Sequence, residues 1–281
     1  MKNLKLFSFS LLVVFSACTK DIKPSEELKL FGFKNIDEVR AHLGKYADLF
    51  VTTNGSIYQS SIKSNNLTTE DWDIFARFTN DPFAPRINGG DFFINTTKMV
   101  FDNAKQTYVV SGKDNPSEEE LGLLLKGNFG KENEAKLIRN GETIFQSHYY
   151  VPNEIAATNL TNFERYDGSA FIKISRKGLN LQWNKDAKNA NGVVAYLSWT
   201  GDNVDLPADK QGTQGNVEIA AKFEDTGNTT ISSNFFQGIP KHASFTLFLI
   251  RGNVEVKDGS DNKNYKFYSY SWYNIRCVLV D

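Results

Sequence analysis

The sequence predicts a mainly β protein, α+β overall, in which a mixed N-terminal region precedes a C-terminal antiparallel β-sandwich. The 281 residues include 22 Phe, 11 Tyr and 20 Gly, a composition suited to pleated, half-buried strands joined by tight turns. From residue 166 onward, eight short apolar runs recur at intervals of about 10–15 residues. Gly, Asn or Asp separates nearly all of them, which is the spacing of a sandwich of seven or eight strands.

The first 18 residues have the order of a secretory signal. Lys2 and Lys5 form a basic segment, and Leu6–Phe15 form an apolar segment that is too short for a bilayer span of about 20 residues. The next residues, Phe15-Ser16-Ala17-Cys18, resemble the lipobox of bacterial lipoproteins, in which the signal is cut before a lipidated Cys. The resemblance implies a signal peptide over 1–17 and lipid attachment at Cys18. The alternative is a plain signal peptide with an incidental Cys.

Residues 18–30 are expected to form a lipidated tether, because Thr19–Glu27 is polar and contains Pro24. Lys20-Asp21 is similar to the charged signals that send some Gram-negative lipoproteins to the outside of the outer membrane. We therefore expect a protein of the Gram-negative cell envelope, held on the outer membrane by its lipid and exposed at the surface, with retention on the inner leaflet as the alternative. The formal charge of −1 gives no reason to expect a nucleic-acid partner.

Residues 31–165 are predicted to be a mixed α+β region. Asn35 and Glu38 have the spacing of a helix N-cap, and the apolar stripe that follows predicts a helix over 35–50. A capping box at Ser117–Glu120 predicts a second helix that ends at Gly127. Trp72, Phe75 and Phe78 are spaced by three, which predicts a short helix or an aromatic-pinned loop. Asn140-Gly141 predicts a hairpin between two apolar runs, Lys136–Ile138 and Thr143–Phe145.

Residues 166–281 are predicted to be the sandwich domain. Its pattern resembles Ig or fibronectin type III sandwiches, which implies a fold and no particular function. Alternation places Leu179, Leu181 and Trp183 on one core-facing side. Cys277 lies in an apolar terminal run and is expected to be a buried, inert thiol. The predicted strands cover Ala170–Ile174, Leu179–Trp183, Val193–Trp199, Val217–Phe223, Thr229–Phe235, Ser244–Ile250, Val254–Val256 and Tyr265–Val280.

The sequence predicts no catalytic residue, no metal site and no cofactor apart from the lipid on Cys18. The chain has three His residues and no G-x-S-x-G, H-E-x-x-H, P-loop or dinucleotide motif. Two oxygen-rich loops, Asn184–Gly192 and Asp258–Asn262, are similar to calcium loops but lack the bidentate Glu. Such loops also suit hairpin turns. Among the 33 acidic residues, no pattern selects a carboxylate pair for polymer hydrolysis.

The last predicted strand carries the candidate binding face. Tyr268, Tyr270 and Trp272 share one side of it, and the residues between them share the other. If the other side is core, this aromatic row is available to stack on sugars or to dock a protein. The alternative is that both sides are covered, either by a second layer or by the N-terminal region. We therefore expect a non-catalytic binding module for a glycan or protein partner, with a structural subunit of an envelope assembly or a polymer-degrading hydrolase as alternatives.

Overall fold

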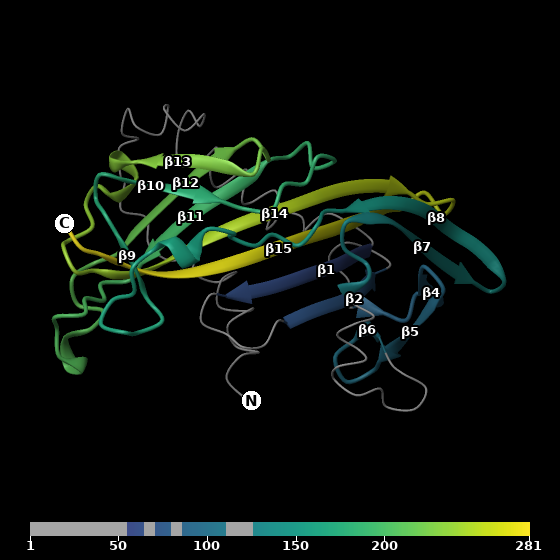
Figure 1. Ribbon diagram of the computed structural model, residues 1–281. Helices are drawn as coiled ribbons and strands as arrows, with labels where there is room; N and C mark the ends of the chain where they lie inside the picture. Colours follow the sequence, from purple (N-terminus) through teal and green to yellow (C-terminus); the bar gives the residue numbers. More distant parts are fainter. Residues whose placement is uncertain (1–54, 65–70, 80–85, 111–125) are drawn as a thin grey trace.

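The computed structural model describes residues 55–64, 71–79, 86–110 and 126–281 (Figure 1). Cys18 and the helix expected over 35–50 lie outside these residues, as does most of the helix expected up to Gly127. The described chain consists of strands, turns and short helical turns, which confirms the mainly β prediction. Its first strands are β1 (Gly55–Ser64), β2 (Asp71–Thr79), β3 (Arg86–Ile87), β4 (Asp91–Ile94), β5 (Thr97–Asp102), β6 (Thr107–Val110), β7 (Lys131–Arg139) and β8 (Glu142–Val151).

The second half of the chain continues with seven strands and three short 3-10 helices. The strands are β9 (Ile172–Ile174), β10 (Gly178–Gln182), β11 (Val193–Trp199), β12 (Val217–Phe223), β13 (Asn228–Ser232), β14 (Ser244–Asp258) and β15 (Asn264–Leu279). The 3-10 helices are η3 (Leu160–Asn162), η4 (Ala208–Lys210) and η5 (Ser233–Phe236). β14 and β15 are the longest strands, with 15 and 16 residues, and Figure 1 shows them side by side through the middle of the molecule.

Thirteen of the strands form one large sheet in the order β12-β11-β14-β15-β1-β2-β6-β5-β4-β7-β8, with β3 beside β2 and β9 beside β15. β1 and β9 run parallel to β15, whereas the other neighbours are antiparallel. β10 and β13 form a separate antiparallel pair. This pair packs over β11, β14 and β15 and makes the C-terminal part sandwich-like, as predicted.

The large sheet curls so far that β8 returns over β14 and β15. Tyr150 of β8 makes the connection: its backbone N–H donates to the Glu255 carboxylate at 3.2 Å. Its carbonyl accepts hydrogen bonds from the Asn253 amide at 3.2 Å and from the Ser269 hydroxyl at 3.3 Å. Figure 1 shows the teal β8 beside the far end of the β14–β15 hairpin.

Two hydrophobic cores result. The N-terminal core lies inside the curl and comprises Ile57, Ile74, Ala76, Phe78, Phe92, Ile94, Met99, Tyr108, Ala135, Leu137, Ile144, Phe145, Tyr149, Val151, Tyr265 and Phe267. The C-terminal core lies between the two sandwich layers and comprises residues from Ile155 to Leu279, among them Leu181, Trp183, Ala195, Leu197, Trp199, Ile231, Phe235, Phe236, Leu247, Leu249, Ile275 and Cys277.

β15 belongs to both cores. Its first residues, Tyr265 and Phe267, fill the N-terminal core, and Ile275 and Cys277 fill the C-terminal core on the same side of the strand. Between these segments the side chains become polar: the buried Ser271 hydroxyl accepts from the Ser61 hydroxyl at 2.8 Å. A strip of satisfied polar groups therefore separates the two cores along a continuous strand.

The hairpin at Asn140-Gly141 is confirmed. Both residues have positive φ (53° and 82°), as a two-residue hairpin turn of the primed type requires. The prediction for Trp72, Phe75 and Phe78 is wrong, because these residues lie in β2. Their spacing of three spans both sides of a strand, and Phe78 is buried whereas Phe75 is half-buried. Pairing of β2 with β1 and β6 determines the conformation here.

The turn expected at Gly252-Asn253, between two separate runs, is also wrong. β14 continues through both residues, which pair with Tyr270 and Ser269 of β15. The partner strand supplies a regular antiparallel ladder across this point, which holds Gly252 extended although Gly is a weak strand former. The polar Asn253 side chain is accommodated because its amide donates to Tyr150 and Glu255.

Candidate binding face and pocket

The structure places Tyr268, Tyr270 and Trp272 on the side of β15 that faces away from both cores. Tyr268 is only 1% exposed, whereas Tyr270 and Trp272 are half-buried. On the opposite side, Phe267 and Ile275 are core residues, as the prediction of an aromatic row required. β15 is a central strand between β14 and β1, so the row is reached only across the face of the sheet.

Two further aromatic residues lie beside this row. Tyr196 of β11 and Phe248 of β14 are directly paired, with ring centroids 5.6 Å apart. Phe248 meets Trp272 edge to face at 6.4 Å, and Trp272 lies 5.5 Å from Tyr270 with the rings tilted by 33°. We call Tyr196, Phe248, Tyr270 and Trp272 the aromatic patch, in which Tyr196 and Phe248 are buried (5% and 8% exposed) and Tyr270 and Trp272 are half-buried. Sequence analysis missed Tyr196 and Phe248 because only strand pairing brings such distant segments together.

Polar groups accompany the aromatic patch. Asn274 follows Trp272 on the same side of β15, and its side-chain oxygen is buried without a hydrogen-bond partner among the described residues. An unsatisfied buried acceptor costs free energy, so this position is locally destabilising. At the other end of the patch, burial and the adjacent Glu218 carboxylate raise the pKa of the Tyr196 phenol. The phenol is therefore neutral and able to donate to Glu218.

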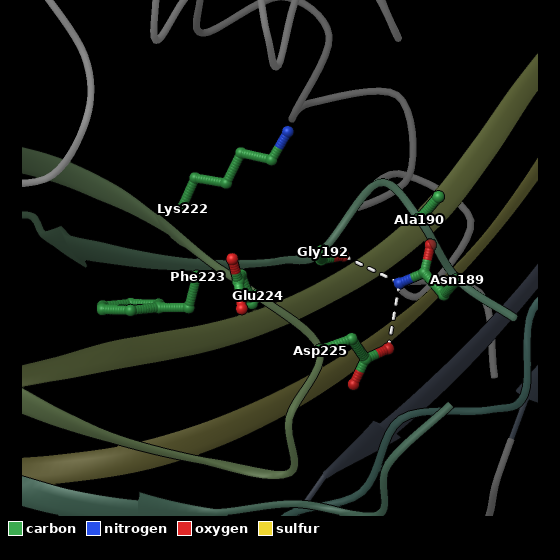
Figure 2. A pocket seen from close by; sticks show the side chains of 7 residues that line it. All are labelled: Asn189, Ala190, Gly192, Lys222, Phe223, Glu224 and Asp225. Carbon is green, nitrogen blue, oxygen red and sulfur yellow. Dashed lines mark hydrogen bonds between the residues drawn. The ribbon is translucent and has the colours of Figure 1, made fainter. Parts of the chain in front are cut away.

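A shallow pocket of about 500 Å³ lies at the opposite end of β12 from Val217. Figure 2 shows the Asn189 amide between two acceptors, the Gly192 carbonyl and the Asp225 carboxylate. These hydrogen bonds measure 2.8 and 2.9 Å. The pocket residues are Asn189, Ala190, Gly192, Lys222, Phe223, Glu224 and Asp225. The Asn189 amide and the Asp225 carboxylate in this pocket are therefore already hydrogen-bonded within the protein.

Asp225 is the centre of a buried ion pair. The Arg251 side chain is completely buried and donates from Nε and Nη2 to the two carboxylate oxygens at 2.7 and 2.8 Å. Trp183 Nε1 also donates to Asp225 at 2.9 Å. Burial by itself would raise the pKa of Asp225, but hydrogen bonds from Arg251, Asn189 and Trp183 outweigh burial and lower it.

The remaining guanidinium protons are also used. Nη1 of Arg251 donates to the Asn153 carbonyl at 3.0 Å, and Nη2 donates to the Asn184 carbonyl. The pair therefore ties β14 to the connector after β8 and to the loop after β10. With every donor directed at a protein acceptor, this site is suited to holding the chain together rather than to acid–base chemistry.

Several oxygens of the two oxygen-rich loops accept hydrogen bonds from the protein itself, but Asp261 Oδ1 is buried without a partner among the described residues. Asp186 accepts from the Tyr150 hydroxyl at 2.9 Å and from the Asn153 backbone N–H at 2.8 Å, and Asn184 Oδ1 accepts from a backbone N–H. In the second loop, Asp261 accepts from the Tyr265 hydroxyl at 2.9 Å and lies 3.4 Å from Arg139. Among the residues that the structure describes, no cluster of three His, Cys, Asp or Glu side chains is placed to hold a metal ion.

The other singled-out side chains lie in separate places. Cys277 is fully buried, as predicted, and burial raises the pKa of its thiol well above the usual value. His148 is exposed on β8 beside Glu134, whereas His242 pairs with Asp205 in a loop near the C-terminus. No described contact joins these groups into one site.

Comparison of the chain with family models, with curated proteins and with solved structures finds no match.

In the described ranges, no helix is both long and apolar enough to cross a membrane. The class that fold and geometry define is thus a mainly β, sandwich-like protein with an aromatic patch on its central sheet.

Proposed function

We propose that this protein is a lipid-anchored lipoprotein of the Gram-negative cell envelope that acts as a non-catalytic glycan-binding module. The observation that carries the binding proposal is the aromatic patch, in which the half-buried Tyr270 and Trp272 are the accessible rings and the buried Tyr196 and Phe248 pack beside them. The anchor proposal rests on the signal-like N-terminus and on Cys18. In this arrangement the lipid on Cys18 holds the protein on the outer membrane, and the binding face is exposed at the cell surface.

The chemistry of the patch favours a sugar over a purely apolar ligand. The apolar faces of sugar rings stack on aromatic rings, which provide a large contact area at low conformational-entropy cost. Asn274, a partly exposed residue on the same side of β15 as Trp272, places a polar amide group near the rings. A sugar can use both the apolar rings and this polar group.

The binding proposal is tested on a glycan array with the full chain in detergent. We expect binding to a subset of glycans and a loss of about tenfold or more in affinity for Trp272→Ala, because a central aromatic anchor contributes about 1–2 kcal/mol. The matched control is Phe93→Ala, which removes a half-buried strand aromatic from β4. Equal binding by wild type, Trp272→Ala and Phe93→Ala would exclude the aromatic patch as the binding site.

If no glycan binds, the same variants test the protein-partner alternative. Wild type, Trp272→Ala and Phe93→Ala would be used to capture partners from gently solubilised membranes. If a stoichiometric protein partner is lost only with Trp272→Ala, the ligand of the aromatic patch is a protein and not a glycan. The chain would then be a subunit of an envelope assembly.

The anchor is tested separately by labelling cells with palmitate. Wild type should incorporate the label and Cys18→Ala should not, since the lipid is attached to the Cys18 thiol. Protease treatment of intact cells then reports the side of the membrane. A protected domain would contradict surface exposure, and an unlabelled wild type would contradict the anchor.

A further inference from the structure

The outer side of the large sheet carries a third group of buried apolar side chains. They are 0–8% exposed, belong to neither hydrophobic core and, by alternation along their strands, point away from both cores. The group comprises Val194, Tyr196, Ala220, Phe248, Tyr268 and Val278. Tyr196 pairs with Ala220 on one side and with Phe248 on the other, and Val194 precedes it on β11. We call Val194, Tyr196, Ala220 and Phe248 the outer apolar face.

The burial of the outer apolar face is not explained by the sheet itself. Ala220 lies on β12, the terminal strand, and has a sheet neighbour on one side only, yet the whole residue is 1% exposed. The described second layer, β10 and β13, packs on the opposite side of the sheet, in the C-terminal core. A small side chain on a terminal strand is shielded this completely when a further element lies across it. The outer apolar face therefore has a covering layer.

Residues 35–50, which lie outside the described residues, have the sequence of such a layer. Their apolar positions recur at helical spacing and are Ile36, Val39, Leu43, Ala47 and Phe50. The polar positions on the opposite side of a helix are Glu38, Lys45 and Asp48. An amphipathic helix laid on a sheet removes both apolar surfaces from water. We propose that residues 35–50 form a helix that packs across the outer apolar face.

The chain before Gly55 is long enough to reach this face. Gly55, the first residue of β1, lies beside Tyr265 of β15, whereas Phe248 lies beside Asn274, nine residues further along β15. The path is about 30 Å along the strand and about 20 Å across the four strand spacings from β1 to β12, a diagonal of about 36 Å. The extended steps from residue 50 to Gly55 and a helix over 35–50 together span about 40 Å.

The other segments outside the described ranges are less well placed. Residues 65–70 join β1 to β2, and residues 80–85 join β2 to β3, so each has only six residues between strands that are already neighbours. Residues 111–125 join β6 to the turn before β7, in the N-terminal half of the sheet. The segment before β1 is therefore the best candidate for the covering layer.

Docking of residues 35–50 is compatible with ligand binding at the aromatic patch. The helix would cover Tyr196 and Phe248, whereas Tyr270 and Trp272 are half-buried and would lie at its edge. Docking does not require that these two rings bind a glycan. A failure of either proposal therefore leaves the other intact.

Thiol labelling tests the covering layer in the full chain in detergent. Val194→Cys places a thiol under the proposed helix, and its reaction with a maleimide is followed by mass spectrometry of the peptide that carries residue 194. We expect slow labelling in this variant. Adding Leu43→Asp should accelerate labelling by about tenfold or more, because a charge in the middle of the apolar side opposes docking and raises the population of the open state.

Ala41→Asp is the matched control, since it adds the same charge to the same segment on the side that would face water. It should leave the labelling of Val194→Cys slow. Cys277, 0% exposed in the C-terminal core, should stay unlabelled throughout and so reports that the fold is intact. If Cys277 is labelled in Val194→Cys, Ala220→Cys takes its place, because Ala220 is 1% exposed on the same face.

Two results would overturn the proposal. Fast labelling of Val194→Cys, with Cys277 protected and no further substitution, would mean that the outer apolar face is open. Equal labelling rates with Leu43→Asp and with Ala41→Asp would mean that the apolar side of residues 35–50 does not cover this face.

Discussion

Aromatic rings make up seven of the 16 side chains in the N-terminal core but only five of the 23 in the C-terminal core, which is mainly aliphatic. Phe78 alone lies 5.3–6.5 Å from four other rings, those of Phe92, Tyr108, Phe145 and Tyr265. In the C-terminal core, the described ring pairs are confined to Phe235, Phe236 and Phe245.

The enclosure of each core explains the difference. The N-terminal core lies inside one curled sheet, whose wider interior takes large rings in tilted and edge-to-face contact. The C-terminal core lies between two layers, where interdigitating Leu, Ile and Val side chains fill a space about 10 Å thick. Curvature of the sheet therefore selects the size of the side chains that fill it.

The two regions also differ in how they bury charge. The C-terminal region holds the fully buried Arg251–Asp225 pair at the margin of its core. In the described N-terminal region, the ion pairs are at least partly exposed, as for Lys98–Asp91, with side chains 57% and 58% exposed. Breaking an ion pair should therefore change the free energy of unfolding by very different amounts in the two regions.

Arg251→Met should have the largest effect. It leaves the buried Asp225 carboxylate without its cation, so we expect the free energy of unfolding to fall by about 3–5 kcal/mol in urea titrations. The matched control is Arg139→Met, because this guanidinium is 29% exposed and 3.4 Å from Asp261. The control should cost less, about 1 kcal/mol or below. Equal losses would contradict the distinction between buried and partly exposed pairs.

Ile275→Ala should lower stability by about 2–5 kcal/mol, because it opens a cavity in the C-terminal core. Since β15 crosses both cores, we also expect faster hydrogen exchange in β1, next to Phe267 in the N-terminal core. Leu137→Ala, in the N-terminal core, should in turn make hydrogen exchange faster in β14. Exchange that changes in one core only would mean that the two cores open independently.

Acidification should weaken the Arg251–Asp225 link by a smaller amount. The pKa of Asp225 is below its ordinary value in the folded protein, so its stabilisation is complete above the unfolded pKa of about 3.9 and is lost as the pH falls through the lower folded value. Unfolding measured from pH 6 downward should therefore be less steeply pH-dependent in Asp225→Asn than in wild type. Parallel curves would show that other carboxylates carry the acid sensitivity.

Lys98→Ala should have the smallest effect. Its ammonium is 2.8 Å from Asp91, but both side chains are largely exposed, so we expect a loss of about 0.2–1 kcal/mol that shrinks further in high salt. The measurement is urea unfolding at low and high ionic strength. If Lys98→Ala loses nearly as much unfolding free energy as Arg251→Met, burial is not the reason for the large effect of Arg251→Met.

Much of the C-terminal fold could be predicted from local pattern. Val193–Trp199 and Val217–Phe223 were expected as strands and are β11 and β12 with the same bounds. The core position of Trp183 is confirmed as well. Alternation and turn residues act over a few positions, so they are visible in one segment without knowledge of its partners. β2 and the middle of β14 were mispredicted because their pairing partners, not their own residues, determine their conformation.

The candidate site could be predicted only in part. The sequence identified the shared side of Tyr270 and Trp272, since alternation along one strand is a local property. It could not identify Tyr196 or Phe248, which join the patch through the pairing of β11 with β14 and of β14 with β15. Nor could it reveal that Tyr268 is buried, or that Asn274 keeps an unsatisfied oxygen.

By itself, the sequence determined the mainly β class, the Asn140-Gly141 hairpin, the buried Cys277 and most strands after residue 166, because periodicity and turn chemistry are local. The tertiary structure alone decided the curl of the sheet, the sharing of β15 between two cores and the Arg251–Asp225 pair. These features depend on contacts between residues far apart in the chain. The distance between partners such as Tyr150 and Glu255 is fixed only when the strands between them pair.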